Sequence, residues 1–129
     1  MQVYSESRRV RSADLDEMLH VNNIRYIVWI QEISKAHWLS RADAKLQALG
    51  VWVVREHKIT YYKSAKLNDD LLLTTWVLEM KGPISTRIVE IKNNKTGDLL
   101  VKAVTDWCFL DPDTLRPKRI PEKVEKRFQ

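Results

Sequence analysis

Residues 24–38 read IRYIVWIQEISKAHW, and this stretch decides the fold. It follows Asn22 and Asn23, which are favoured helix N-caps because their side-chain oxygen accepts an unpaired backbone N–H. We predict a helix from Ile24 to about Trp38. Its apolar and aromatic side chains point in nearly every direction, so the helix needs cover on almost all sides. A single sheet wrapped around it, together with a partner subunit, would provide that cover.

The rest of the chain has the character of β-strands, although the alternation in the first of them is weak. The predicted strands cover 3–11, 51–62, 71–80, 85–92 and 99–110. Turn-forming residues stand between the later strands. Ser40 is expected to cap a second, shorter helix, with Gly50 at its C′ position. Strands that follow one another, with the long helix set apart, predict an α+β fold with an antiparallel sheet.

Length and composition predict one domain that spans residues 1–129. No apolar run approaches the roughly 20 residues that cross a bilayer, and the N-terminus lacks a signal-peptide pattern. We therefore expect no membrane association. The lone Cys108 has no disulfide partner, which is typical of the cytoplasm. The net charge of +5 favours anionic partners. No base-stacking motif or basic helix supports nucleic-acid binding.

Two carboxylates and a histidine stand directly before the predicted helix, in the pattern Asp14-x-Asp16-x-x-x-His20. A helix N-terminus attracts negative charge because its first N–H groups have no partner within the helix. Hydrolysis of a thioester needs a base or nucleophile, and it needs donors for the oxyanion that forms. Asp16 would supply the first, as attacking group or as the base that activates water, and the N–H groups near Asn22 to Ile24 would supply the second.

This order of residues resembles the opening of hotdog-fold thioesterases. The similarity is to the 4-hydroxybenzoyl-CoA thioesterase-like group, and the chain also looks like plant and bacterial acyl-ACP thioesterases. It rests on residues 9–16, on the block His20-Val21-Asn22-Asn23, and on Tyr26 and Glu32. Weaker similarity continues along nearly the whole chain to residues 116–121.

The resemblance implies a hotdog fold, in which a long central helix is wrapped by a five- or six-stranded antiparallel sheet. It implies an acyl-thioester hydrolase that acts on acyl-CoA or acyl-ACP without a cofactor. It also implies homodimers that often pair into tetramers, with active sites at the dimer interface. The family's catalytic carboxylate matches Asp16, its frequent histidine matches His20, and its oxyanion donor falls near Asn23.

The other candidates each have a structural alternative. Asp14 is expected to bind a local backbone N–H, and Asn22 is expected to act first as a cap. Tyr26 is assigned to the core or to a wall of the acyl pocket. Glu32 is expected to have a structural partner, because a carboxylate in a buried helix needs one. A second active-site carboxylate is the alternative for Glu32.

The turn at residues 81–87 lies near the CoA phosphates in enzymes of the resembled family. The candidates for contact with these phosphates are Lys81, Ser85 and Arg87. The alternative is that they are ordinary residues of an exposed turn, since exposed turns are often charged. No metal site is predicted, because the histidines lack ligand spacing with one another or with the cysteine. Cys108 is expected to be a packed thiol.

Two positions depart from the family pattern. Leu19 stands where the CoA-type group usually has glycine, and Met18 stands where the acyl-ACP enzymes usually have asparagine. Neither change removes Asp16 or His20. Two alternatives stay open within the same fold, namely a hydratase or dehydratase and a non-catalytic module that binds acyl thioesters. Release of thiol from an acyl-CoA separates a thioesterase from both.

Overall fold

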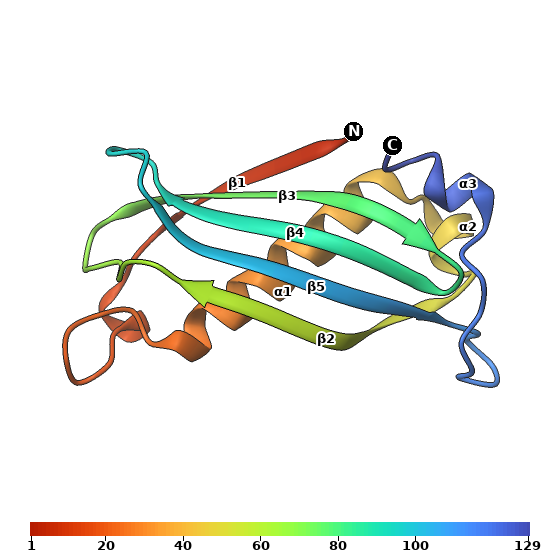
Figure 1. Ribbon diagram of the computed structural model, residues 1–129, viewed down its shortest axis with the longest axis horizontal. Helices are drawn as coiled ribbons and strands as arrows, with labels where there is room; N and C mark the ends of the chain where they lie inside the picture. The colour runs from red at the N-terminus through yellow and green to blue at the C-terminus, as the bar shows by residue number, and fades with distance from the viewer.

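In the computed structural model, which describes residues 1–129, one antiparallel sheet supports the whole chain (Figure 1). Its order is β1-β3-β4-β5-β2, and every neighbouring pair runs antiparallel. The strand predictions are confirmed within one or two residues at each end, and the sheet has five strands. The strands are β1 (Val3–Arg9), β2 (Val51–Tyr61), β3 (Asp70–Lys81), β4 (Ile84–Asn93) and β5 (Leu99–Leu110).

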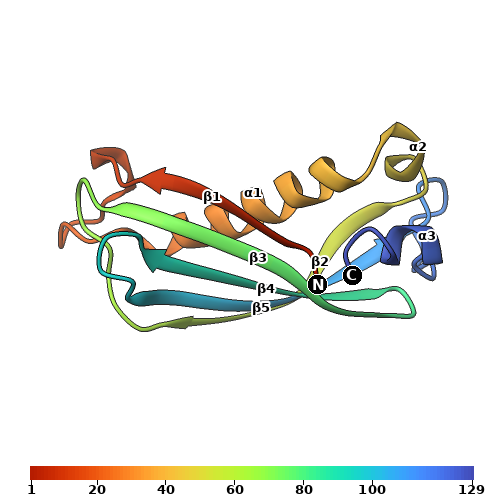
Figure 2. The same cartoon turned by 90° about the horizontal axis from the view of Figure 1, so that it is seen from above.

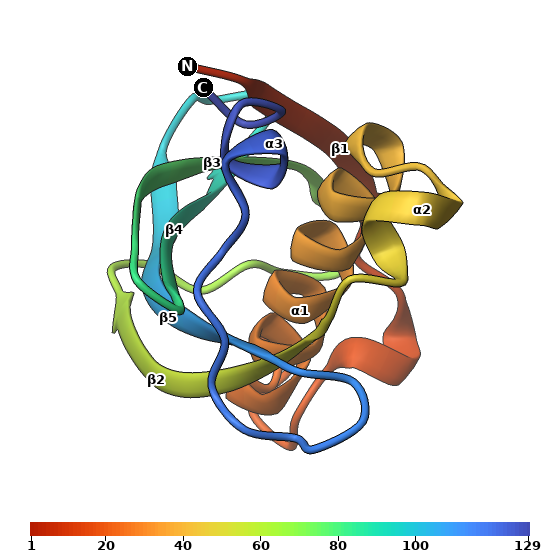
Figure 3. The ribbon, with the colours of Figure 1, turned by 90° about the vertical axis from the view of Figure 1, so that its right-hand side faces the viewer.

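The long helix α1 (Asn23–Arg41) lies across one face of this sheet, and the sheet curves around it (Figures 2 and 3). It begins at Asn23, one residue before the predicted start, and its cap is Asn22, whose side chain accepts the N–H of Ile24 at 3.0 Å. It continues to Arg41, about one turn beyond the predicted end. The fold class and the hotdog arrangement are therefore confirmed.

Within the single chain, α1 is covered on one side only. Its sheet-facing stripe is buried, but the opposite side of the helix is exposed, and that side is polar at Gln31, Glu32 and Lys35. Only Ile24, 68% exposed in the first turn, leaves a large apolar side chain open near the start. The sheet therefore buries one stripe of the helix, six of its 19 residues. No helix of the structure is long and apolar enough to span a membrane.

Two local predictions after α1 are wrong. Ser40 belongs to the last turn of α1, where its hydroxyl donates to the His37 carbonyl at 2.8 Å. The cap of α2 (Ala44–Gln47) is Asp43, which accepts the Leu46 N–H at 3.0 Å. Gly50 is required by packing, because a Cβ there would lie 2.4 Å from the ring of Phe109.

The interior falls into two clusters along α1. The larger cluster packs the first half of the helix against the sheet and includes Tyr26, Trp29 and Ile30. The second lies near the C-terminal end and includes Phe109 and Phe128, the latter just beyond α3 (Glu122–Glu125). Figure 2 shows α1 rising away from the sheet toward this second end. The divergence leaves room between helix and sheet that side chains only partly fill.

Candidate active site

The loop before α1 is held by a short antiparallel pairing of residues 14–16 with residues 20–22. The Asp16 N–H donates to the His20 carbonyl at 2.8 Å, and the Asn22 N–H donates to the Asp14 carbonyl at 2.9 Å. Leu15 and Val21 form the bridge between these bonds. This pairing fixes Asp16 opposite His20, which lies two residues before the helix cap Asn22.

The Asp16 carboxylate is oriented by its own loop. One oxygen, Oδ1, accepts the N–H groups of Met18 at 2.9 Å and His20 at 3.2 Å. Its other oxygen, Oδ2, makes no hydrogen bond or ion pair, and the residue is exposed. A carboxylate held on one side and free on the other can attack a carbonyl or remove a proton from water.

Asp14 has the structural role that the sequence predicts. It is buried, its Oδ2 accepts the Arg11 N–H at 2.8 Å, and its Oδ1 lies 2.7 Å from Arg25 Nε. The carboxylate therefore ties the short 3-10 helix at Ser12–Asp14 to the first turn of α1. Both oxygens are occupied, which leaves Asp16 as the free carboxylate of the loop.

At the start of α1, the backbone N–H of Asn23 is unpaired. The Ile24 N–H is taken by the Asn22 side chain, and the Arg25 N–H is taken by the Asn22 carbonyl at 2.8 Å. The N–H of Asn23 has no partner within the chain. Of the N–H groups expected to hold an oxyanion, the one at Asn23 is therefore available without rearrangement.

His20 contributes to this site through its backbone. Its N–H and carbonyl both bind Asp16, and it forms an isolated bridge to Lys66. Its half-buried imidazole makes no hydrogen bond within the chain. The structure thus brings together Asp16, His20, Asn22 and Asn23, as the sequence predicts.

Tyr26 and Glu32 lie apart from this group. Tyr26 is 2% exposed, its hydroxyl oxygen accepts the Ala65 N–H at 2.9 Å, and burial raises its pKa. It therefore anchors the loop at Ala65 to the helix. Glu32 is exposed and has no hydrogen bond or ion pair, so the expected partner within the chain is absent.

The prediction that residues 81–87 form an exposed turn is wrong for most of the segment. Lys81 is exposed at the end of β3, but Ser85 and Arg87 are only 3% and 5% exposed within β4. Both side chains face α1, on the same side of the strand as Val89 and Ile91. The alternation of these four residues in the sequence is the signal that places Arg87 inside the molecule.

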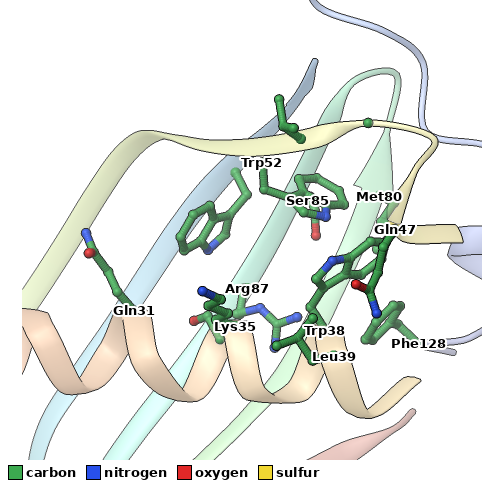
Figure 4. Close-up of a pocket in the computed structure, with 14 residues that line it drawn as sticks. Gln31, Lys35, Trp38, Leu39, Gln47, Trp52, Met80, Ser85, Arg87 and Phe128 are labelled. Atoms are coloured by element: carbon green, nitrogen blue, oxygen red, sulfur yellow. The ribbon is translucent and has the colours of Figure 1, made fainter. Parts of the chain in front are cut away.

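Ser85 and Arg87 line a cavity of about 470 Å³ between the C-terminal half of α1 and the sheet. Figure 4 shows Arg87 reaching from β4 toward the helix near Lys35 and Leu39. The rest of the wall combines aromatic and polar side chains. The aromatic ones are Trp38, Trp52, Trp107 and Phe128, and the polar ones are Gln31, Ser34, Lys35 and Gln47. The sequence does not predict this cavity, because the cavity depends on the divergence of α1 from the sheet.

Leu19 adopts φ +61°, the left-handed conformation that favours glycine, and its side chain is 70% exposed. Replacement by glycine should relieve this strain and raise the free energy of unfolding by about 1 kcal/mol. Urea denaturation at fixed protein concentration measures the change. Met18→Gly is the matched control, because Met18 has an ordinary φ and should lose stability. Equal effects of the two changes would refute the strain.

Comparison with known sequences identifies the relatives of this chain. Acyl-CoA thioester hydrolase YbgC of Escherichia coli O6:H1 is 27% identical over 128 residues, which cover 94% of this chain and 92% of that protein. The acyl-[acyl-carrier-protein] hydrolase FATB3 of Cuphea viscosissima is 28% identical over 78 residues, or 60% of this chain. The match spans only 19% of that chloroplast enzyme.

Solved structures share the fold. The probable thioesterase YbaW from Escherichia coli superposes with a TM-score of 0.87 at 21% identity, covering 95% of this chain and 94% of that one. A mutant 4-hydroxybenzoyl CoA thioesterase complexed with 4-hydroxybenzoyl CoA gives a TM-score of 0.90 at 15% identity, with full coverage of both chains. The model of the thioesterase-like superfamily matches residues 10–128. The resemblance is thereby confirmed, and the chain belongs to the thioesterase-like superfamily.

Proposed function

We propose that this chain is an acyl-CoA thioesterase in which Asp16 is the catalytic carboxylate. One observation carries this assignment: the free oxygen of Asp16 stands beside a helix start whose Asn23 N–H has no partner. The full-length match to an acyl-CoA thioester hydrolase supports it. The acyl-ACP relatives make carrier-protein thioesters the second substrate class.

In the proposed reaction, the thioester carbonyl lies at the start of α1, with its oxygen toward the Asn23 N–H. Asp16 either attacks the carbonyl carbon or takes a proton from the water that attacks. In the first route the C–S bond breaks, the thiolate leaves, and water then hydrolyses the anhydride formed on Asp16. In the second route water adds to the carbonyl carbon, the C–S bond breaks, and the proton taken by Asp16 passes to the thiolate. In both routes the products are the carboxylic acid and the thiol. His20 contributes by holding the Asp16 carboxylate through its backbone N–H.

We also propose that the chain acts as a homodimer that can pair further into tetramers. Two observations support an interface. Met18, Leu19 and Ile24 expose large apolar side chains beside Asp16, and the outer edge of β2 has no neighbouring strand. A second copy would cover both and close the site against water. Sedimentation equilibrium measures the assembly, and a purely monomeric enzyme with full activity would refute the dimer.

Release of free thiol tests the function directly. The purified protein should liberate thiol and carboxylic acid from at least some members of a panel of aliphatic and aromatic acyl-CoAs. Acyl-carrier-protein thioesters with the same acyl groups form the parallel arm. Hydrolysis of the acyl-carrier-protein thioesters alone would make these, and not acyl-CoAs, the substrate class. Absence of thiol release from both arms would favour the non-catalytic binding module.

A further inference from the structure

Arg87 is a buried cation without an acidic partner. It is 5% exposed, and it takes part in none of the ion pairs of the structure. Its nitrogen Nη1 donates to His37 Nδ1 at 2.8 Å and to Thr75 Oγ1 at 3.0 Å, and both of these partners are neutral. Burial lowers the pKa of Arg87 to about 10, so the guanidinium stays charged at neutral pH. Buried charges are normally paired, and this one has no counter-charge within the chain.

The free edge of this guanidinium faces open space. Nε and Nη2 make no hydrogen bond within the chain, and the two nitrogens lie on the same edge of the planar group. The fully enclosed side-chain nitrogens that lack a partner are His57 Nε2 and Trp107 Nε1, and no atom of Arg87 is among them. Nε and Nη2 are therefore open to the cavity of about 470 Å³ that Arg87 lines. Two donors on one edge match the two oxygens of a carboxylate.

Two further donors lie on the same face of the sheet. Ser85 is two residues before Arg87 on β4, and Trp107 is opposite Ser85 on β5, so all three side chains face α1. The indole N–H of Trp107 is enclosed without a partner, and the Ser85 hydroxyl makes no hydrogen bond within the chain. Lys35 adds a positive charge at the exposed side, and no aspartate or glutamate lines the cavity. The lining therefore favours an anion.

The cavity is separate from the candidate active site within the chain. Arg87 contacts His37, which lies fourteen residues after the start of α1, or about 21 Å along the helix. Buried side chains of the larger cluster fill the space between, among them Trp29, Ile30 and Ile33. The cavity opens instead to solvent along the helix, where its lining includes the exposed residues Gln31, Lys35 and Leu39. Its occupant is therefore a molecule of its own and not the acyl part of a thioester at Asp16.

Aromatic rings determine the second property of this occupant. Trp38 lies against Trp52 with ring centroids 5.7 Å apart and against Phe128 at 5.8 Å, so one aromatic wall joins α1, β2 and the C-terminal segment (Figure 4). The Cζ atom of Arg87 lies 6.0 Å from the centre of the Phe128 ring. Such rings favour another aromatic ring, stacked or edge-on, whereas a small, strongly hydrated anion would lose water against them. The volume lies in the range of small-molecule sites.

We propose that this cavity binds a free aromatic carboxylate. The carboxylate lies on the Nε–Nη2 edge of Arg87, and the ring packs against Trp38 and Trp52. One-ring and two-ring acids such as benzoate and 2-naphthoate represent the class. The inference goes beyond the proposed thioesterase, because this ligand is not the substrate and no bond in it is made or broken. Arg87 is thus the anion-binding residue of a second site.

Calorimetric titration of the full chain tests the class of ligand. Each acid is compared with a neutral amide of the same shape and with an acid whose ring is saturated. The two sets are benzoate, benzamide and cyclohexanecarboxylate, and 2-naphthoate, 2-naphthamide and decahydro-2-naphthoate. We expect at least one aromatic acid to bind about tenfold or more tightly than its amide, and about threefold or more tightly than its saturated counterpart. Absence of both preferences, or of either one, in both sets would overturn the proposal.

Three variants place the acid at Arg87. Arg87→Met should abolish the preference for the acid over its amide, and replacement of a buried charge by an apolar side chain is compatible with folding. Lys123→Met, an exposed change on α3, removes the same charge elsewhere and should keep the preference. Asp16→Asn should also keep it, because the two sites are separate. Retention of the preference in Arg87→Met, or its loss in Asp16→Asn, would overturn the assignment.

A spectroscopic measurement on the unaltered protein locates the acid even where Arg87→Met fails to fold. The chain has five tryptophans, and each indole N–H gives its own proton–nitrogen resonance. The spectra of Trp107→Phe and Trp76→Phe identify two of these resonances by their disappearance. Saturation with the tighter-binding acid should shift the Trp107 resonance and leave that of Trp76, which lies on the opposite face of the sheet. An unmoved Trp107 resonance at saturation would overturn the proposal.

Discussion

Replacement of Asp16 by asparagine is expected to lower the kcat of thioester hydrolysis about a thousandfold, since removal of a general base or nucleophile costs two to four orders of magnitude. Asparagine keeps a carbonyl oxygen that can accept the N–H groups of Met18 and His20, so the loop should persist. The variant loses the negative charge and the ability to take a proton or form an anhydride. Thiol release from the best acyl-CoA substrate measures the loss.

Glu17→Gln is the matched control for this experiment. Glu17 is the next residue in the same loop, it is exposed, and its carboxylate has no partner within the chain. Its neutralisation removes the same charge from the same surface and should change the rate by less than about threefold. A similar loss in both variants would mean that local charge, and not the Asp16 carboxylate itself, supports the reaction. Unchanged activity in Asp16→Asn would refute the catalytic assignment.

His37 is expected to make the fold sensitive to mild acid. Burial, together with the nearby Arg87 and Arg41, lowers the pKa of His37 from 6.5 to about 4. The folded state keeps the imidazole neutral, whereas the unfolded chain binds a proton once the pH falls below 6.5. The free energy of unfolding therefore contains the full contribution of His37 above pH 6.5, and it loses this contribution as the pH falls from 6.5 to about 4. The loss amounts to about 3 kcal/mol by the lower limit.

Comparison with His37→Asn isolates this contribution. Asparagine can place an acceptor near the position of Nδ1 and does not titrate, so Arg87 keeps a partner. Urea unfolding of both proteins at pH 7 and pH 4 gives the difference. The wild type should lose about 3 kcal/mol more than the variant over this interval. Parallel losses would show that His37 does not titrate differently in the folded and unfolded states.

Local features of this molecule could be predicted from its sequence, because they depend on neighbouring residues. The N-cap at Asn22, the bounds of the strands and the backbone partner of Asp14 all follow from short-range hydrogen bonding or side-chain alternation. The loop before α1 belongs to this group, since the residues that orient Asp16 lie within four positions of it. The residue types in this loop and their spacing were enough to predict that Asp16 and His20 lie together before the helix.

Features that depend on distant residues could not be predicted in this way. The requirement for glycine at position 50 arises from the ring of Phe109. The neutral state of His37 arises from its burial, which lowers its pKa, and from Arg87 on another element. Glu32 was expected to be buried because the apolar residues around it suggested a helix enclosed on all sides. The cavity and its unpaired guanidinium exist only once α1 diverges from the curved sheet.

The order of strands in the sheet also sets an order of folding. β3, β4 and β5 are consecutive hairpins, but β1 must find β3, with Val3 opposite Trp76, and β2 must find β5, with Val51 opposite Leu110. On a ribosome, the N-terminal strand, the long helix and the second strand all emerge before any sheet partner exists. β1 and β2 are therefore made first but can join the sheet only after β3 and β5 have been made. Loop closure over such separations makes the process slow, on the order of milliseconds to seconds.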